Sequence, residues 1–529
     1  MEREKLGSRL GFILLSAGCA IGCGNVWKFP WMCGEYGGGG FVLIYLICLV
    51  LLGLPVMTME FALGRASQAS PVRMYRKIEK PGQKWHIHGY VALVGNIALM
   101  AFYTVVTGWM LYYFVSFLTG GYADLSFGAM ITNPGLNVGY MAITVALAFG
   151  ILCFKLQGGL ERVSKYMMVI LLLLMVVLAI HSATLSGAKE GLTFYLVPDF
   201  SRMNGSVVVG AMNQAFFTLS LGIGSMAIFG SYIGKDHSLL GESIHVILLD
   251  LFVAIVAGLI LFPACFTFDL EVGSGPSLLF DTMATVFRNM AGGRWWGSVF
   301  FLFMVFAALS TVLAVCENIL ACVRELTGWS RPKGSIICGI GIFLIALTTA
   351  LGYSTFSGFQ PFAEGSAWLD FWDFIVSTNL LPLGSLVVAV FCCNKRFGWG
   401  WDQLVAEANA GSGPKVKNWM KPIFMVVVPV AILVIYITAC SHLNGDNDGC
   451  CIRCMHLRKK HRSFQIDAFS FTDIITPAQE KACRFIPPRR GCSTAPHQGG
   501  RWLPLRRRPQ SPVQWRSCAG AASRWKVLS

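Results

Sequence analysis

The chain has 529 residues, of which 55% are hydrophobic and only 13% are charged, and its formal net charge at pH 7 is +15. A composition this apolar excludes an ordinary soluble domain of this length. Apolar segments of about 20 residues recur along the chain, as a hydrocarbon core about 30 Å thick requires, so we expect a protein that crosses a membrane many times.

About eleven hydrophobic segments are predicted as membrane-spanning helices, and no cleavable signal peptide is expected. The first segment contains Asn25 and leads into Lys28 and Pro30 without a small-residue cleavage site. The predicted spans are 11–33, 40–64, 88–118, 138–156, 165–185, 207–233, 243–270, 296–327, 335–353, 374–393 and 421–440.

Glycine interrupts two of these segments. The first segment contains the run from Gly18 to Asn25, and the sixth contains the run from Ser220 to Ser225. Glycine costs about 1 kcal/mol relative to alanine inside a helix, and in lipid every freed backbone group needs a partner. Such runs are expected where the backbone lines a cavity, and a matching pair in two halves of a chain predicts the substrate site of a secondary transporter.

Lysine and arginine predict a cytoplasmic amino terminus, because these residues concentrate in loops on the inner side of a membrane. They precede the first helix and crowd the loops after the second, fourth, eighth and tenth helices. The loops at 119–137 and 354–372 contain none.

The last part of the chain, 441–529, differs from the rest because its hydrophobicity ends and arginine, proline and cysteine dominate. One interpretation is a basic arm that binds anionic lipid or nucleic acid. The composition favours a second interpretation, in which this part is a basic, disordered extension of doubtful origin. No nucleic-acid partner is expected.

Two longer motifs resemble the neurotransmitter:sodium symporter family. One runs from Arg9 through the first interrupted segment to Gly39, and the other runs from Gln214 to Gly222. The similarity extends over roughly residues 3–440 and is strongest to bacterial amino-acid transporters with eleven helices.

This resemblance implies an all-α polytopic membrane protein with a five-plus-five inverted repeat, unwound helices 1 and 6, and one further helix. The implied parts are a transporter core at 1–440, with repeats at about 9–185 and 207–393 and helix eleven at 421–440, and the tail at 441–529. The implied location is the inner membrane of a bacterium, in contact with membrane lipid.

The resemblance also implies sodium-coupled import of an amino acid, and no enzymatic activity. Monoamine-carrying members of the family have an aspartate where this chain has Gly22. The substrate is therefore expected to bring its own carboxylate. Since the implied lining is apolar and has no countercharge, we expect a neutral apolar or aromatic amino acid.

Two sodium ions are implied, each bound by backbone carbonyls and polar side chains, which are the oxygen ligands a hard cation prefers. The residues implied for the first ion are Ala20, Asn25, Thr218 and Asp250. The residues implied for the second ion are Gly18, Ile21, Ala307, Ser310 and Thr311.

The substrate carboxylate is expected at the amides of Gly22 and Cys23, near the positive end of a half-helix, with help from the Tyr103 hydroxyl. The residues expected around the substrate are Ala20, Gly22, Cys23, Gly24, Leu99, Tyr103, Phe217, Thr218, Ser220, Ile223, Thr311 and Val315.

Gates are implied on both sides of this site. The outer-gate residues are Lys28, Asp370, Asp373, Tyr103 and Phe217, with either aspartate as the partner of Lys28. The inner-gate residues are Arg3, Tyr232 and Glu325.

Chloride independence is expected from Asp250, because a fixed carboxylate can offset sodium charge in a low-dielectric interior. Chloride-dependent relatives have asparagine at this position, and a serine where this chain has Ala254.

Two other classes of protein remain as alternatives. A proton-coupled amino-acid permease shares the architecture but does not need the Ser310–Thr311 pair together with Asn25 and Asp250. A polytopic membrane enzyme needs a nucleophile with a base or a metal cluster, whereas His181 and His245 are isolated.

Overall fold

A computed structural model describes residues 4–201, 203–270, 277–362 and 365–444, with side chains up to residue 438. These residues form helices and loops, and the pairing outside helices among them is an isolated bridge between His237 and Ser412. The predicted all-α class is confirmed. Of the predicted tail at 441–529, residues 445–529 lie outside the described residues.

The helices of the first half are α1 (Arg9–Ala20), η1 (Gly24–Lys28), α2 (Phe29–Glu35), α3 (Gly39–Cys48), η2 (Leu49–Gly53), α4 (Leu54–Ser67), α5 (Pro71–Ile78), α6 (His86–Thr119), α7 (Phe127–Thr132), α8 (Pro134–Leu152), η3 (Gln157–Glu161), α9 (Arg162–Ala183) and α10 (Ala188–Leu196). Those of the second half are α11 (Gly205–Thr218), α12 (Ser225–Gly230), α13 (Leu239–Thr267), η4 (Leu278–Met283), α14 (Ala284–Asn289), α15 (Gly293–Thr327), α16 (Arg331–Ala350), α17 (Trp368–Asp373), η5 (Phe374–Leu380), α18 (Leu381–Cys393), α19 (Trp401–Ala408), η6 (Asn418–Met420), η7 (Ile423–Val427) and α20 (Val428–Asn444).

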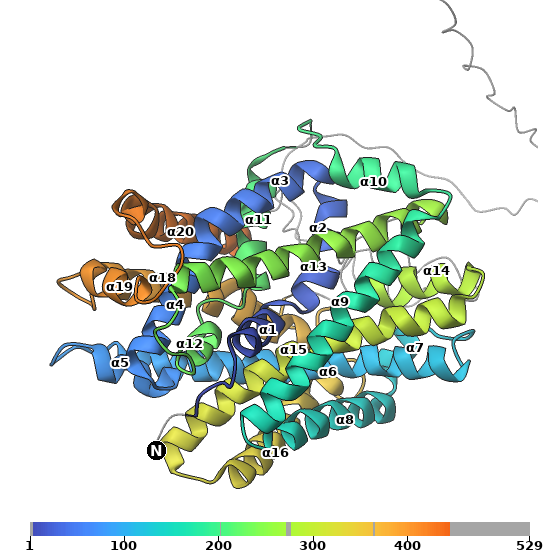
Figure 1. Ribbon diagram of the computed structural model, residues 1–529. Coiled ribbons are helices and arrows are strands. Elements are labelled where there is room, and N and C mark those ends of the chain that lie inside the picture. The colour runs from blue at the N-terminus through green and yellow to red at the C-terminus, as the bar shows by residue number, and fades with distance from the viewer. Residues whose placement is uncertain (1–3, 202, 271–276, 363–364, 445–529) are drawn as a thin grey trace, which may run out of the picture. The chain divides into compact units, whose positions relative to one another are not determined.

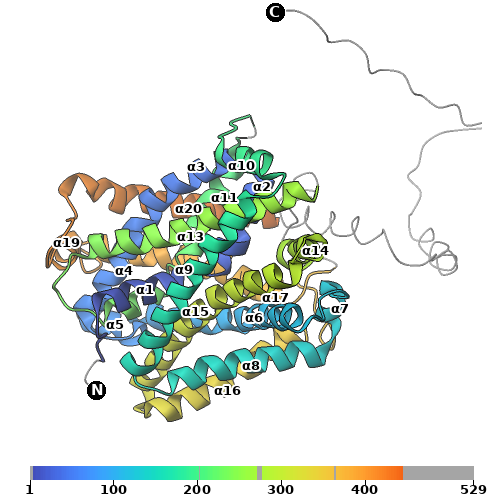
Figure 2. The same ribbon diagram turned by 45° about the vertical axis from the view of Figure 1, so that its right-hand side comes forward.

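Within the described ranges, nine helical stretches are long and apolar enough to cross a membrane, and α1 with α2 makes a tenth, bent by 51°. The long helices α6 and α15 pack along each other, and α1 packs against α9, α13 and α15. The short helices α5 and α19 lie at one end of this bundle, and α7 and α14 lie at the other (Figures 1 and 2).

Both predicted interruptions are present. Helix α1 ends at Ala20 and helical structure resumes with η1 at Gly24. Helix α11 ends at Thr218 and α12 begins at Ser225. Three residues in the second break have positive φ: Ser220 (51°), Gly222 (94°) and Gly224 (71°). A β-carbon at Gly222 would lie 2.1 Å from the Leu381 carbonyl oxygen, so this backbone position excludes a side chain.

The buried carboxylate of Glu60 on α4 binds the freed amides of the second break. Its Oε1 accepts a hydrogen bond from the Gly222 amide at 2.6 Å, and its Oε2 accepts bonds from the amides of Met226 and Ala227 at 3.1 and 3.3 Å. Since backbone groups cannot stay unbonded in a membrane interior, Glu60 stabilises the broken conformation.

Replacing Gly222 with alanine is expected to destabilise the protein by at least about 2 kcal/mol, because positive φ and the Leu381 carbonyl both oppose a β-carbon. The midpoint of thermal unfolding in detergent measures this loss. Gly150→Ala is the control: no described atom lies within 4 Å of a β-carbon there, so that midpoint should hold or rise slightly. Equal midpoints for the two variants would contradict the steric account.

Candidate functional site

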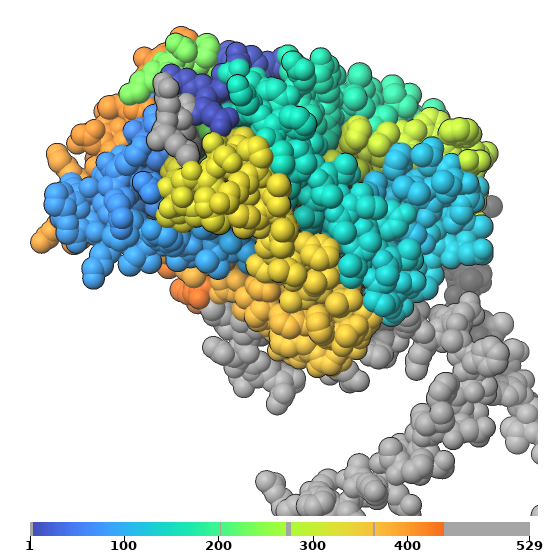
Figure 3. Space-filling view, turned by 90° about the horizontal axis from the view of Figure 1, so that it is seen from below, coloured from blue at the N-terminus to red at the C-terminus, as the bar shows by residue number. Residues whose placement is uncertain are grey.

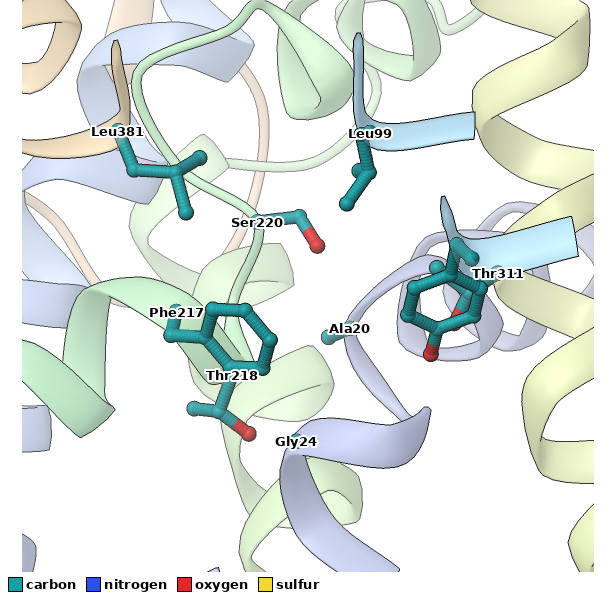
Figure 4. A pocket seen from close by; sticks show the side chains of 9 residues that line it. Ala20, Gly24, Leu99, Phe217, Thr218, Ser220, Thr311 and Leu381 are labelled. Atoms are coloured by element: carbon teal, nitrogen blue, oxygen red, sulfur yellow. The ribbon is translucent and has the colours of Figure 1, made fainter. Parts of the chain in front are cut away.

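A small pocket lies between the two helix breaks. It is lined by Ala20, Gly24, Leu99, Tyr103, Phe217, Thr218, Ser220, Thr311 and Leu381. Figure 4 shows Leu99 and Leu381 at one end, Gly24 at the other, and Ser220 between them. The two breaks therefore meet at a common cavity, as their corresponding positions in the sequence predicted.

Eight of the nine lining residues are among those predicted to surround the substrate, and Leu381 was missed. Leu381 begins α18 directly after η5 and before Pro382. The π-helical turn η5 is a feature of the folded chain, so the sequence offered no signal for Leu381.

Four predicted substrate residues, Gly22, Cys23, Ile223 and Val315, are not among the lining residues. The Ile223 carbonyl instead accepts a hydrogen bond from the side-chain amide of Asn96 at 2.8 Å. Val315 is fully buried in α15, one turn beyond Thr311.

Gly22 and Cys23 lie beside the pocket and contact its polar side chains. The Cys23 amide donates to the Tyr103 hydroxyl oxygen at 2.7 Å. A β-carbon at Gly22 would lie 2.2 Å from that oxygen and 2.4 Å from the Thr311 hydroxyl oxygen. A side chain at Gly22 would therefore require Tyr103 or Thr311 to move away from the first break.

A buried cluster of oxygen atoms lies at the first break. The Asn25 side-chain amide donates to Asp250 Oδ1 at 2.8 Å, and the Thr218 hydroxyl lies 3.4 Å from the same oxygen. Ala20 ends α1 beside them and lines the pocket. The structure thus brings together all three side chains predicted for the first sodium ion, and Ala20 lines the pocket together with Thr218.

Two oxygens in or beside this cluster have no hydrogen-bond partner among the described residues; one belongs to Gln214, whose side-chain amide bonds the Gly24 carbonyl at the same break. They are Asp250 Oδ2 and Gln214 Oε1, and both side chains are fully buried. A carboxylate oxygen left unbonded in a protein interior is costly unless a cation or a proton compensates it. The donor set therefore fits a bound sodium ion.

A second oxygen cluster joins α15 to the end of α1. The Ser310 hydroxyl lies 3.3 Å from the Ile21 carbonyl and 2.8 Å from the Ala307 carbonyl. The Thr311 hydroxyl lies 3.2 Å from the Ile21 carbonyl and 3.4 Å from that of Gly18. All five residues predicted for the second sodium ion thus meet in one cluster.

The carbonyls of this second cluster are available because α1 stops. In an uninterrupted helix the carbonyls of Gly18 and Ile21 would bond amides four residues later, and the break at Ile21 removes that possibility. The carbonyls at the end of α1 and the two hydroxyls of α15 together give the several oxygen ligands that a hard cation requires.

The predicted outer-gate residues are spread over several elements. The Lys28 ammonium lies over the Phe217 ring, 3.8 Å from its centroid. Asp370 Oδ2 accepts from the Ala367 amide at 2.9 Å at the start of α17, and Asp373 Oδ1 accepts from the Ser377 hydroxyl at 2.6 Å. A cation therefore covers the aromatic side chain that borders the pocket.

At the opposite end, Tyr232 and Glu325 hold different partners. The Tyr232 hydroxyl donates to Glu317 at 2.8 Å, and its carbonyl accepts from the Leu6 amide at 3.2 Å. The Glu325 carboxylate accepts from the Ser70 hydroxyl at 2.7 Å. The third predicted inner-gate residue, Arg3, lies outside the described residues.

Sequence reasoning missed an ion-pair network beside these residues. Arg331 at the start of α16 pairs with the buried Glu317, and Arg324 pairs with Glu4 at 3.0 Å. The Glu161 carboxylate also accepts from the Gly7 amide at 2.8 Å. The contacts of Glu4 and Glu161 join segments more than 150 residues apart, so no local pattern could reveal them, and they fasten the segment before α1 to the rest of the bundle.

A model of the sodium:neurotransmitter symporter family matches residues 3–126 and 123–447 of this chain. An uncharacterized sodium-dependent transporter of Bacillus subtilis, YhdH, is 34% identical over 81% of this chain and 96% of its own length. An uncharacterized sodium-dependent transporter of Haemophilus influenzae is 31% identical over 83% of this chain and 98% of its own length.

A solved structure is also similar. The crystal structure of MhsT in complex with L-phenylalanine matches with a TM-score of 0.75 and 34% identity, over 83% of this chain and all of that chain.

The attachment of the segment before α1 should weaken in acid. Burial raises the pKa of Glu4. The charges of Arg331 and Arg324 and a hydrogen bond from the Leu156 amide lower it by a larger amount, so the resulting pKa is below the ordinary value. A carboxylate with a lowered pKa contributes stability above its unfolded pKa and loses that stability as pH falls through its folded pKa.

Amide hydrogen exchange across residues 5–12, corrected for intrinsic rates, should therefore accelerate below about pH 4. In Glu4→Gln the exchange should be fast already at neutral pH and change little with acid. Glu190→Gln, at an exposed position on α10, is the control and should behave like the wild type. Slow exchange in Glu4→Gln at neutral pH would contradict the attachment.

Proposed function

The chain belongs to the sodium:neurotransmitter symporter family, and on that premise we propose that it imports a neutral, apolar or aromatic amino acid together with sodium, by alternating access. It is an integral membrane protein and a sodium-dependent transporter rather than an enzyme, so the membrane-enzyme alternative falls away.

The observation that carries this proposal is the meeting of two buried oxygen clusters and one pocket at two helix breaks. The cluster with the unbonded Asp250 oxygen would bind one sodium ion, and the cluster of Ser310 and Thr311 would bind another. Thr218 and Thr311 each belong to a cluster and to the pocket lining. An ion and a substrate that share such residues can stabilise one another's binding, which is the requirement for coupled transport.

The substrate class follows from the pocket lining, which contains no lysine, arginine, aspartate or glutamate among the described residues. A basic or acidic side chain would lose its hydration there without gaining a countercharge. Leu99, Phe217 and Leu381 favour an apolar or aromatic side chain instead. The similar transporter MhsT was solved in complex with L-phenylalanine, which supports this class.

The pocket itself is too small for such a substrate, with a volume of about 20 Å³, room for little more than a water molecule. Side chains that border it must therefore move when an amino acid binds. Phe217, which is only partly buried and lies beneath the Lys28 ammonium, is placed to do so.

The ends of the bundle support an orientation with the amino terminus in the cytoplasm of a bacterium. The end that carries α5 and α19 contains the lysine- and arginine-rich loops, and the segment before α1 is fastened there by Glu161 and Tyr232.

Uptake into proteoliposomes tests the proposal and its proton-coupled alternative. An inward sodium gradient should drive uptake, and replacing sodium with choline at a fixed pH gradient should abolish it. Leucine, methionine and tryptophan should compete with the transported substrate. Stronger competition by glutamate or lysine would contradict the pocket assignment, and full uptake in choline would favour the proton-coupled permease.

Tyr103→Phe should weaken amino-acid binding by about tenfold or more, because a buried carboxylate would lose a charge-assisted hydrogen bond worth about 1.5–3 kcal/mol. Binding of sodium alone should change less. Equilibrium binding of amino acid and of sodium measures both effects. An equal loss of the two affinities would mean that Tyr103 only packs against the broken helix.

Chloride independence is part of the proposal, and the hydrogen bonds around Asp250 support it. The Gln214 side-chain amide donates to the Gly24 carbonyl at 2.8 Å, and the Thr218 hydroxyl faces the Asp250 carboxylate. Both groups are already engaged in these contacts. A site whose donors already bond a backbone carbonyl and a carboxylate is poorly suited to an anion.

Wild-type uptake should therefore persist when gluconate replaces chloride. Asp250→Asn combined with Ala254→Ser removes the carboxylate and adds a donor one turn along α13, so uptake by this variant should become chloride-stimulated. Strong chloride dependence of the wild type would overturn this part of the proposal.

A further inference from the structure

Two loops from distant parts of the chain meet at the end of the bundle that carries α5 and α19. The loop 79–85 leads into α6, and the loop 394–400 follows α18. The Lys80 ammonium donates to the Lys395 carbonyl, and the Trp85 indole donates to the Phe397 carbonyl at 2.6 Å. Blue and orange parts of the chain, the colours of these two regions, meet at the left edge of the face shown in Figure 3.

These contacts gather four exposed cations, Lys80, Lys84, Lys395 and Arg396, which we call the basic platform. Within the described part of the chain, Lys395 of the platform forms an ion pair with Asp402 at 3.6 Å. Both side chains are more than three-quarters exposed. Such a pair contributes little binding energy. The platform therefore keeps its positive charge available for a partner.

The arginines nearby behave differently. Arg65 pairs with Glu407 at 2.7 Å, Arg9 pairs with Glu242 at 2.9 Å, and Arg331 pairs with Glu317. The acid closest in sequence to the platform, Glu79, is turned to His86, whose Nδ1 lies 2.7 Å from it. These three arginines are thus neutralised by acids, whereas the platform cations keep their charge.

Exposed aromatic side chains accompany the platform. Phe397 is 57% exposed and its ring lies 5.3 Å from the Arg396 guanidinium. Trp419 is 64% exposed and lies in the sequence between the exposed Lys417 and Lys421. Aromatic residues beside cations are typical of the zone where lipid headgroups meet acyl chains.

The platform also lies at the depth of that zone. Lys84 precedes the first residue of α6 by two positions, and Lys395 follows the last residue of α18 by two positions. Helix α6 and the stretch Trp368–Cys393, which ends with α18, are each long and apolar enough to cross a membrane. Four cations at the ends of two adjacent spans match the clusters that recognise anionic headgroups.

We propose that the basic platform is a binding site for the phosphate of an anionic phospholipid, held by Lys80, Lys84, Lys395 and Arg396, with Phe397 against the acyl chains. The site would take a lipid from the membrane leaflet on this side, which under the proposed orientation is the cytoplasmic one. An occupied site would bridge the loop before α6 and the loop after α18, and so would add to the contacts that already join them.

The test compares spin-labelled phosphatidylglycerol with spin-labelled phosphatidylcholine around the full chain in liposomes, by electron paramagnetic resonance. The wild type should hold phosphatidylglycerol preferentially. Replacing all four platform cations with glutamine should lower that preference about fivefold or more. The control removes four other basic charges, at Lys155, Arg162, Lys165 and Lys333, and should retain the preference.

A second variant, Lys84→Gln with Arg396→Gln, leaves the Lys80 and Trp85 contacts between the loops intact and should lose part of the preference. Equal losses in the platform and control variants would overturn the proposal, because the preference would then come from diffuse charge. Absence of any preference in the wild type would overturn it as well. Displacement of the labelled lipid by soluble glycerol phosphate would show a free-anion site instead and would also overturn it.

Amino-acid uptake measured in the same liposomes reports separately on the transport proposal. Loss of lipid preference with intact uptake bears on the platform alone, and loss of uptake in all variants and the wild type bears on the transport proposal alone.

Discussion

Where a membrane helix breaks, its freed amides and carbonyls have no water to bond, and this constraint governs the molecule around residues 21–24 and 219–224. At the second break the Glu60 carboxylate accepts hydrogen bonds from three backbone amides. At the first, Asn25 accepts the Gly22 amide through its side-chain oxygen, and Gln214 donates to the Gly24 carbonyl. A buried polar side chain and a freed backbone group would each cost free energy without a hydrogen-bond partner. At both breaks the two kinds of group bond each other.

The same partners form the proposed transport site. Asn25 bonds the first break and also donates to Asp250, so the backbone of one broken helix is linked to the oxygen cluster. Tyr103 accepts the Cys23 amide and lines the pocket. A substrate carboxylate or a sodium ion that changes these bonds would change the stability of the break itself. Such a link between ligand and helix conformation is the physical basis on which alternating access can rest.

The fold and much of the site could be predicted because their signals are local. Glycine interruptions marked both breaks, and the residues around them, such as Thr218 and Ser310, lie in recognisable motifs. Leu381 and the pairing of Glu4 with Arg324 could not be predicted, since each depends on which distant helices pack together. Ile223 and Val315 were predicted to surround the substrate. They do not line the small pocket of this structure, which must widen before an amino acid fits, so their role stays a prediction.

The central claim is that sodium and the amino acid occupy neighbouring sites made by the two breaks and stabilise one another. Equilibrium binding of radioactive sodium to the purified protein, with and without amino acid, tests it most directly. The account predicts that the amino acid tightens sodium binding, that sodium tightens amino-acid binding by the same factor, and that replacing Ser310 and Thr311 with alanine reduces this coupling. Amino-acid binding that is equally tight in sodium and in choline would contradict it.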